Sequence, residues 1–195
     1  AQGVSADLDR AATAVREGNL VVYPTETVYG LGADALDPEA VSAVFAAKRR
    51  DRDDPISLAV PTVDAVTEYA APTERELAFC REFLPGPVTV VLAAREAVPS
   101  VLTGGRDRVG VRVPDHALAR ALLERVAPLT ATSANLTGRQ SARRIADLDP
   151  EIREAATVVL DGGETPGGGS TVVDVSAGEI LRRGALAADV DAWLA

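Results

Sequence analysis

The chain has 195 residues, of which 47% are hydrophobic and 25% are charged, a composition typical of a globular protein and unlike that of a disordered one. The net charge of −9 argues against a protein whose whole surface binds nucleic acid, because contacts to phosphates need concentrated Lys and Arg. No apolar run reaches the roughly 20 residues of a membrane span, and the N-terminal AQGVSADLDR lacks the basic and apolar regions of a signal peptide, so we expect a cytoplasmic protein that does not contact a membrane.

The first half of the chain alternates predicted helices with short predicted strands. Ser5 suits the N-cap of the first helix, Gly18 its end, and Pro38 the first turn of the second helix. We expect helices over residues 6–17 and 38–49, strands at 20–23 and 56–60, and two acidic helices at 63–69 and 73–83. Strands and helices that alternate in this way are typical of an α/β fold.

The second half contains more strands, and proline and glycine interrupt it. Pro-Gly-Pro at 85–87 forces a turn, and GGETPGGG at 162–169 predicts a flexible or tightly turning loop. We expect strands at 88–93, 109–113, 129–132, 157–160, 171–175 and 179–182, helices over 116–126 and around 143–156, and a short amphipathic segment at 190–194. The complete pattern predicts a single α/β domain, residues 1–195, with one twisted mixed sheet of about seven strands and flanking helices.

Three predicted strand ends carry small hydroxyl residues. The first strand stops at Pro24 in YPTET, a loop that contains no lysine, and the other two stretches are TATSAN at 130–135 and GGGSTVVD at 167–174. Each stretch alone is typical of a turn or a helix cap. Ligands in α/β folds gather outside strand ends, so the three stretches together favour a shared pocket over three separate caps.

One lysine stands among the 20 basic residues, and it begins the cluster Lys48-Arg49-Arg50-Asp51-Arg52 at the end of a predicted helix. Lys carries a compact point charge, whereas Arg carries a planar, forked guanidinium group, so the two are not interchangeable at a phosphate. A single lysine in an arginine-rich chain therefore indicates a chemical role. The alternative is that this lysine remained by chance and has no such role. Cations at a helix C-terminus also complement the helix dipole in solvent. In this acidic protein the cluster suits an anion such as a nucleotide phosphate.

Arg112 alternates with two valines in the sequence VGVRVP, so its side chain points to the opposite face of the predicted strand. A partly buried Arg needs an anionic partner. The residues alone leave two partners open, a substrate carboxylate and an internal Asp.

Several familiar catalytic sites are missing from the sequence. There is no GxxxxGK[ST] phosphate loop, and LGADAL lacks the glycines of a dinucleotide fingerprint. With one His and one Cys, the chain offers no convincing zinc site or Ser-His-Asp triad, and we predict no metal-ligating residues. We expect Cys80 to pack in the core and His116 to lie at the surface. Acid–base work would then fall to carboxylates or substrate groups, and the sequence identifies no general base.

A set of short motifs, which spans nearly the whole chain in one order, resembles the YrdC domain family. The motifs are YPTETVYGLGADA at 23–35, KRR at 48–50, LPGPVTVVL at 84–92, VGVRVPDH at 109–116, SAN at 133–135, STVVDV at 170–175 and LRRG at 181–184. One motif alone would be weak, but the ordered set is specific. The resemblance implies a YrdC-like fold, the α/β twist.

The same resemblance implies an L-threonylcarbamoyladenylate synthase, an enzyme of the nucleotidyltransferase class. The family joins L-threonine, bicarbonate or CO2 and ATP, and releases pyrophosphate. The product, threonylcarbamoyl-AMP, passes to a tRNA threonylcarbamoyl transferase complex that modifies position 37 of tRNA. Mg²⁺ is expected with ATP, held largely by phosphates and water because the sequence shows no carboxylate cage. Weak binding of tRNA itself is a further expectation.

The matched motifs assign roles residue by residue. The resemblance implies that the nucleotide side and the catalytic pair are formed by Lys48 and Arg50. It implies a threonine pocket made of Thr27, Arg112, Ala131 and Ser170, so that the substrate carboxylate becomes the partner of Arg112. It implies the remaining ATP contacts at Asp54, Arg108, Ser133, Asn135, Ser141 and Arg182.

The chain departs from the family pattern at several positions. Asp51 stands where proline often follows the KxR motif, and Arg183 stands where proline usually follows the arginine. Ala59 occupies a position where longer archaeal relatives carry a threonine-contacting His. The extra C-terminal domain of the longer members is missing, so we expect the short, single-domain form.

Two other functions compete with the synthase. The first is an RNA-binding module of the same fold, for tRNA or double-stranded RNA and without catalysis. The acidic net charge and the single concentrated cationic cluster argue against it. The second is the related carbamoyl-transfer domain of hydrogenase maturation, which occurs in long chains with zinc-finger and acylphosphatase portions.

Overall fold

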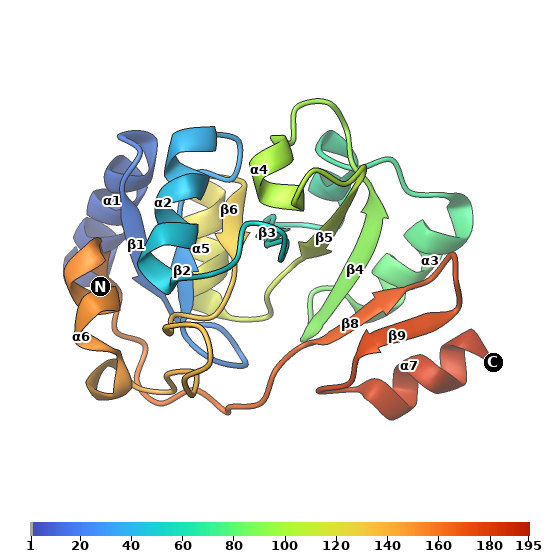
Figure 1. Ribbon diagram of the computed structural model, residues 1–195. Coiled ribbons are helices and arrows are strands. Elements are labelled where there is room, and N and C mark those ends of the chain that lie inside the picture. Colours follow the sequence, from blue (N-terminus) through green and yellow to red (C-terminus); the bar gives the residue numbers. More distant parts are fainter. Residues whose placement is uncertain (1) are drawn as a thin grey trace.

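The computed structural model describes residues 2–195, in which helices cover a twisted array of nine strands (Figure 1). The strands are β1 (Leu20–Tyr23), β2 (Gly30–Gly32), β3 (Ser57–Ala59), β4 (Val88–Ala93), β5 (Arg108–Arg112), β6 (Leu129–Ala131), β7 (Ala156–Val159), β8 (Thr171–Asp174) and β9 (Glu179–Arg182). The α-helices are α1 (Gln2–Arg16), α2 (Pro38–Lys48), α3 (Glu74–Phe83), α4 (Ser100–Thr103), α5 (Ala117–Arg125), α6 (Pro150–Ala155) and α7 (Ala187–Leu194). Two 3₁₀ turns are η1 (Asp64–Glu68) and η2 (Ile145–Asp147).

The strands of residues 2–195 form two mixed sheets, one in the order β2–β1–β7 and one in the order β6–β3–β5–β4–β8–β9. The sheets meet between β2 and β6. There the Leu31 N–H donates to the Thr132 carbonyl at 2.9 Å, and the Thr130 N–H donates to the Ala33 carbonyl at 3.0 Å. The mixed α/β class predicted from the sequence is confirmed, with the expected single sheet divided into two joined parts.

The sequence does not predict strand β2, because Gly-Leu-Gly has low strand propensity. This segment pairs antiparallel with β1, and its backbone lies against the ring of Tyr23. A Cβ atom at Gly32 would come within 2.9 Å of that ring, so the close approach requires glycine. The pairing folds the loop at 24–29 back over the end of β1.

Helix α2 begins and ends at well-defined caps. The Asp37 side chain accepts the Glu39 N–H at 3.0 Å, directly before Pro38 at the first helical position. The helix ends where Arg49 adopts the left-handed conformation, with φ 51°. Lys48 therefore stays on the helix, whereas Arg50 belongs to the loop that follows.

Two predicted helices differ from the structure. The segment at 63–69 forms the 3₁₀ turn η1 instead of an α-helix. The helix predicted around 143–156 is reduced to η2 and the short α6, because the residue before a proline disfavours the helical conformation and Asp149 precedes Pro150. The sequence does not predict α4, and the segment at 190–194 is the end of a longer helix, α7. The other predicted helices and strands are present; β1, β4 and β9 have the predicted bounds, and the ends of the others are shifted.

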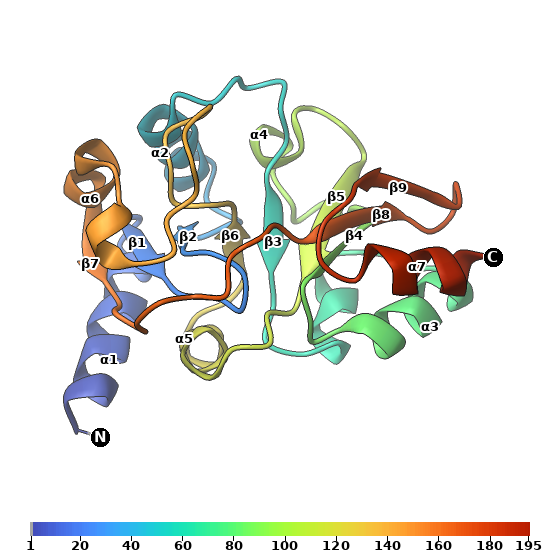
Figure 2. The ribbon, with the colours of Figure 1, turned by 90° about the horizontal axis from the view of Figure 1, so that it is seen from below.

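The main core lies against the central strands, where Leu58, Val90 and Val111 are fully buried. Helix α3 packs against β4 and helix α7 against β9. The two helices lie side by side (Figure 2), and the ring centroids of Phe79 and Trp193 are 5.1 Å apart. Cys80 is fully buried in this core, as predicted, and burial raises the pKa of its thiol to about 12. Between residues 2 and 195, every helix is too short or too polar to cross a lipid bilayer.

Candidate functional site

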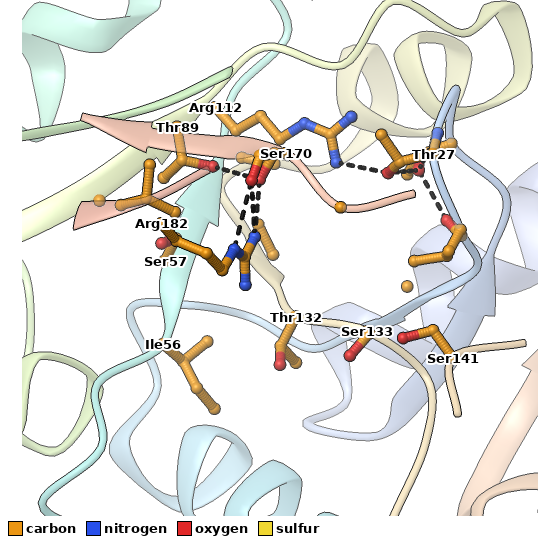
Figure 3. Close-up of a pocket in the computed structure, with 18 of the residues that line it drawn as sticks. Thr27, Ile56, Ser57, Thr89, Arg112, Thr132, Ser133, Ser141, Ser170 and Arg182 are labelled. Carbon is orange, nitrogen blue, oxygen red and sulfur yellow. Dashed lines mark hydrogen bonds between the residues drawn. The ribbon is translucent and has the colours of Figure 1, made fainter. Parts of the chain in front are cut away.

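A cavity of about 720 Å³ opens between the two sheets, at the ends of several strands (Figure 3). Its wall contains Thr27 from the loop after β1, Thr132 from the loop after β6, and Ser170 from the segment before β8. These are the three hydroxyl-bearing stretches of the sequence. The prediction that they share one pocket is confirmed.

Most of the residues that the sequence assigns to a site line this cavity. Lys48, Asp54 and Asn135 do not. The assigned residues on the wall are Thr27, Arg50, Arg108, Arg112, Ala131, Ser133, Ser141, Ser170 and Arg182. Segments far apart in the chain thus meet at one place, while the chemical roles of the individual residues stay predictions.

One end of the cavity is formed by the loop after β1 and by Arg112 at the end of β5. Thr25 and Thr27 are buried, and their hydroxyl oxygens lie 3.0 Å apart. Nη1 of Arg112 donates to Oγ1 of Thr27 at 3.3 Å. This end of the cavity therefore places hydroxyl groups and a guanidinium next to each other.

Arg112 has an anionic partner within the chain, and that partner is Glu26. Nη2 of Arg112 forms an ion pair with Oε1 of Glu26, while Oε2 of Glu26 accepts the Asp115 N–H at 2.5 Å. The sequence leaves an internal Asp and a substrate carboxylate as alternatives, and the structure supplies a Glu. Nε of Arg112 is buried without a hydrogen-bond partner in the described chain, so this donor is unused.

Ser170 lies directly before β8 and contacts one residue of each neighbouring strand, Thr89 of β4 and Arg182 of β9. Its Oγ lies 3.0 Å from Oγ1 of Thr89 and accepts Nη2 of Arg182 at 3.0 Å (Figure 3). The sequence does not single out Thr89 as a site residue. It alternates with Val88 and Val90 and so faces the opposite side of β4, a signal that could have identified it.

Lys48 lies behind the cavity wall. Its side chain is 1% exposed, and Nζ donates to the carbonyl of Ser133 and lies 3.5 Å from the Oγ of the same residue. Burial lowers the pKa of Lys48 to about 8, and the charge of Arg50 adds to this effect. The lysine therefore holds a loop whose hydroxyl group faces the cavity.

Asn135 and Asp54 also act from outside the wall. Nδ2 of Asn135 donates to the carbonyls of Leu136 at 2.9 Å and Arg139 at 3.0 Å, so this side chain closes the loop that leads to Ser141. The exposed Asp54 pairs with Arg50 at 3.3 Å, and its carbonyl accepts Nε of Arg50 at 2.9 Å. Both residues hold neighbouring segments that line the cavity.

The described cavity wall carries six arginines and no Asp or Glu; they are Arg50, Arg106, Arg108, Arg112, Arg143 and Arg182. Arg108 pairs with Asp174 at 3.1 Å, outside the wall. Arg182 forms no ion pair within residues 2–195 and donates only to Ser170. Burial lowers the pKa of Arg182, with contributions from the nearby charges of Arg112 and Arg50. This concentration of cations suits a polyanionic ligand.

His116 does not line the cavity. It is half-buried, and its Nδ1 accepts the Ala119 N–H at 3.4 Å as the N-cap of α5. Burial lowers the pKa of His116, whereas Glu26 and Asp115 oppose that shift. Its role in the described chain is therefore to begin a helix.

Residues 13–184 match the model of the Sua5, YciO and YrdC protein family, which carries the description "Telomere recombination". A threonylcarbamoyl-AMP synthase of Pyrococcus abyssi is 42% identical over 170 residues, which cover 85% of this chain and 50% of that protein. A threonylcarbamoyl-AMP synthase of Xanthomonas axonopodis pv. citri is 36% identical over 181 residues, or 90% of this chain and 97% of that protein. The chain thus spans about half the length of the Pyrococcus relative and nearly all of the Xanthomonas one.

A solved structure gives the same comparison in three dimensions. The crystal structure of P. abyssi Sua5 complexed with L-threonine has a TM-score of 0.83 and 40% sequence identity to this chain. The match covers 91% of this chain and 54% of the other. The family match over residues 13–184 includes every residue of the described cavity wall.

Proposed function

Because the chain belongs to the Sua5, YciO and YrdC family, we propose that it is an L-threonylcarbamoyladenylate synthase. In this nucleotidyltransferase reaction, L-threonine, bicarbonate or CO2 and ATP give threonylcarbamoyl-AMP and pyrophosphate. The observation that carries the proposal is one cavity with two unlike parts, a hydroxyl and guanidinium end and an arginine-rich remainder without Asp or Glu on the described wall. The names of the Pyrococcus and Xanthomonas relatives support the same activity.

L-Threonine occupies the end formed by Thr27, Arg112, Ala131 and Ser170. Arg112 receives the substrate carboxylate, and the unused donor on its buried Nε favours an additional acceptor there. The hydroxyl oxygens of Thr27 and Ser170 suit the ammonium and hydroxyl groups of threonine. The complex of P. abyssi Sua5 with L-threonine supports threonine as the ligand, and the assignment to these four residues is part of the proposal.

ATP occupies the remainder of the cavity. Its phosphates lie toward the guanidinium groups of Arg50 and Arg182, with Lys48 adding charge from behind the wall. Arg108, Ser133 and Ser141 add contacts from the wall. Asp54 and Asn135 act from outside the wall, by holding Arg50 and the loop that leads to Ser141. Mg²⁺ enters with the nucleotide as part of the substrate and is held by phosphates and water. The described residues contain no group of three or more His, Cys, Asp or Glu side chains that could hold a metal ion.

The chemistry consists of positioning and electrostatic stabilisation. The threonine ammonium group first releases a proton to solvent, and its amine nitrogen then attacks the carbon of CO2 or bicarbonate to give a carbamate. Bicarbonate loses water in this step, whereas with CO2 the nitrogen releases a second proton to solvent. A carbamate oxygen then attacks the α-phosphorus of ATP, and pyrophosphate leaves. The arginines offset the negative charge that develops on the phosphates during this displacement.

The product is a mixed anhydride of a carbamate and a phosphate, which is consumed by a tRNA threonylcarbamoyl transferase. The RNA-binding alternative is less well supported, because the lining arginines face a cavity whose volume is that of a small-molecule site. The salt dependence of tRNA binding distinguishes the RNA-binding module from the synthase. An RNA module binds tRNA with an affinity that falls steeply as salt rises, whereas the synthase needs no such complex to turn over.

The test is incubation with L-threonine, bicarbonate and ATP in the presence of Mg²⁺. We expect pyrophosphate release that requires all three substrates, and a product with the mass of threonylcarbamoyl-AMP. Omission of threonine is the matched control. Pyrophosphate release that is indifferent to threonine would overturn the proposal, and salt-sensitive tRNA binding without turnover would favour the RNA module.

A further inference from the structure

We propose that Glu26 determines where phosphate binds in the cavity, because its carboxylate cancels the charge of Arg112. The inference rests on the proposed function, since it concerns how one cavity keeps threonine and ATP apart. All the charged residues on the described wall are arginines. The wall alone therefore does not explain why a triphosphate would avoid the Arg112 end.

The ion pair of Arg112 with Glu26 is the most buried of the described pairs that involve a lining arginine. Its two side chains are 10% and 16% exposed, compared with 21% and 60% for Arg50 and Asp54. Water and salt screen an exposed pair strongly and a buried pair weakly. Glu26 therefore compensates the charge of Arg112 more completely than Asp54 compensates that of Arg50.

Glu26 is also fixed in place. One carboxylate oxygen pairs with Arg112, and the other accepts the backbone N–H of Asp115 at 2.5 Å. The Glu26 side chain does not line the cavity. It therefore acts on a ligand indirectly, through its ion pair with Arg112 and through the electric field of its carboxylate. A zwitterionic amino acid carries no net charge and can bind the free donors of Arg112 without net repulsion, whereas a phosphate anion is repelled by Glu26.

The opposite situation holds at Arg182. Its guanidinium donates to Oγ and the carbonyl of Ser170 and forms no ion pair within the described chain. Figure 3 shows this group projecting into the space between Arg112 and Ser170 on one side and Ile56 and Thr132 on the other. The guanidinium group of Arg182 is therefore an uncompensated positive charge available to a triphosphate, whereas Arg112 and Glu26 form a pair with no net charge. Glu26 is a positioning residue that makes the Arg112 end selective for a neutral amino acid.

The test is calorimetric binding of inorganic pyrophosphate to Glu26→Gln, without threonine or ATP. Gln keeps the size of the side chain and removes its charge. We expect Glu26→Gln to bind an additional pyrophosphate at the Arg112 end of the cavity. Its affinity there should be about tenfold higher than that of the wild type, because the variant lacks the carboxylate that repels the anion. Threonine should compete with that additional pyrophosphate. Asp191→Asn is the matched control. Asp191 lies on α7 and forms an exposed ion pair with Arg183, so this substitution makes the same charge change at the surface.

Equal pyrophosphate binding by the wild type and a folded Glu26→Gln would overturn the proposal. So would weaker threonine binding with no gain in pyrophosphate binding, which is the result of a purely structural role. Glu26→Asp keeps the charge and should behave as the wild type. If Glu26→Gln does not fold, a competition experiment on the wild type tests the proposal. Pyrophosphate that displaces threonine from the Arg112 end of the wild-type cavity would contradict the proposed selectivity for a neutral amino acid. These measurements require no turnover, so failure of the proposed reaction is distinguishable from failure of this inference.

Discussion

The buried ammonium group of Lys48 donates a hydrogen bond to the backbone carbonyl of Ser133, a residue whose side chain lies on the cavity wall (Figure 3). Lys48 forms no ion pair within residues 2–195, so no carboxylate in contact with it neutralises its charge. The lysine thus has two effects on the cavity: it holds the Ser133 loop, and it adds positive charge from behind the wall.

Lys48→Met is expected to lower kcat/KM for threonylcarbamoyl-AMP formation by about 100-fold or more, because a preorganised charge near the phosphates is lost. Met fills the same channel with a flexible apolar chain. Lys48→Ala should also be inactive, and it should lose about 2 kcal/mol of stability through the cavity left behind. Pyrophosphate release measures activity, and thermal unfolding measures stability. A folded Lys48→Met with full activity would make this lysine incidental.

The contribution of Lys48 to the stability of the protein should rise with pH between its folded-state pKa and its unfolded-state pKa. Burial lowers the pKa of Lys48 from 10.5 to about 8 in the folded state, so between these values the unfolded chain binds more protons. The free energy of unfolding of the wild type, relative to Lys48→Met, should therefore be flat below about pH 8 and increase by roughly 1.4 kcal/mol per pH unit above it. Denaturant unfolding across this range is the measurement. Parallel curves for the two proteins would contradict the prediction.

Activity should change with pH in the opposite direction. If the charged form of Lys48 supports catalysis, kcat/KM for ATP should fall as pH rises through about 8. Lys48→Arg keeps its charge over this range and should flatten the profile, although its level of activity will be lower because the planar fork does not fit a lysine site. A wild-type profile that stays level beyond this pH would show that the ammonium charge is not required.

Arg112→Gln should raise KM for threonine by about 100-fold and leave KM for ATP nearly unchanged, since Arg112 lies at the end of the cavity with Thr27. The variant also leaves Glu26 charged and largely buried, which should cost about 3 kcal/mol of stability. The double variant Glu26→Gln with Arg112→Gln should recover much of that stability without recovering threonine binding. Equal rises in both KM values would mean that Arg112 does not separate the substrates.

The sequence predicts the cavity well because hydroxyl residues at strand ends are a local signal. Thr27, Ser133 and Ser170 each follow or precede a short apolar strand, and an α/β fold brings such ends together. The alternation around Arg112 likewise predicts a side chain that points away from its valine neighbours. These inferences need only strand periodicity and the general architecture of the fold.

The remaining features depend on contacts between distant segments. The partner of Arg112 is Glu26, which is far away in sequence and has no pattern that marks it. The position of Lys48 behind the wall depends on how α2 packs against the Ser133 loop, and strand β2 exists because Gly32 fits against Tyr23. Neither residue spacing nor propensity contains this information.

Thr89→Val should raise KM for threonine about fivefold, the effect of roughly 1 kcal/mol for one hydrogen bond, without changing KM for ATP. Val keeps the volume and the β-branch but removes the hydroxyl that lies 3.0 Å from Oγ of Ser170. Thr103→Val is the matched control, because Thr103 is also buried but its hydroxyl donates within α4 to the carbonyl of Ser100 at 3.3 Å. Steady-state kinetics with each substrate varied in turn distinguishes the two variants. If Thr89→Val and Thr103→Val affect threonine binding equally, the contact between Thr89 and Ser170 supports only the fold.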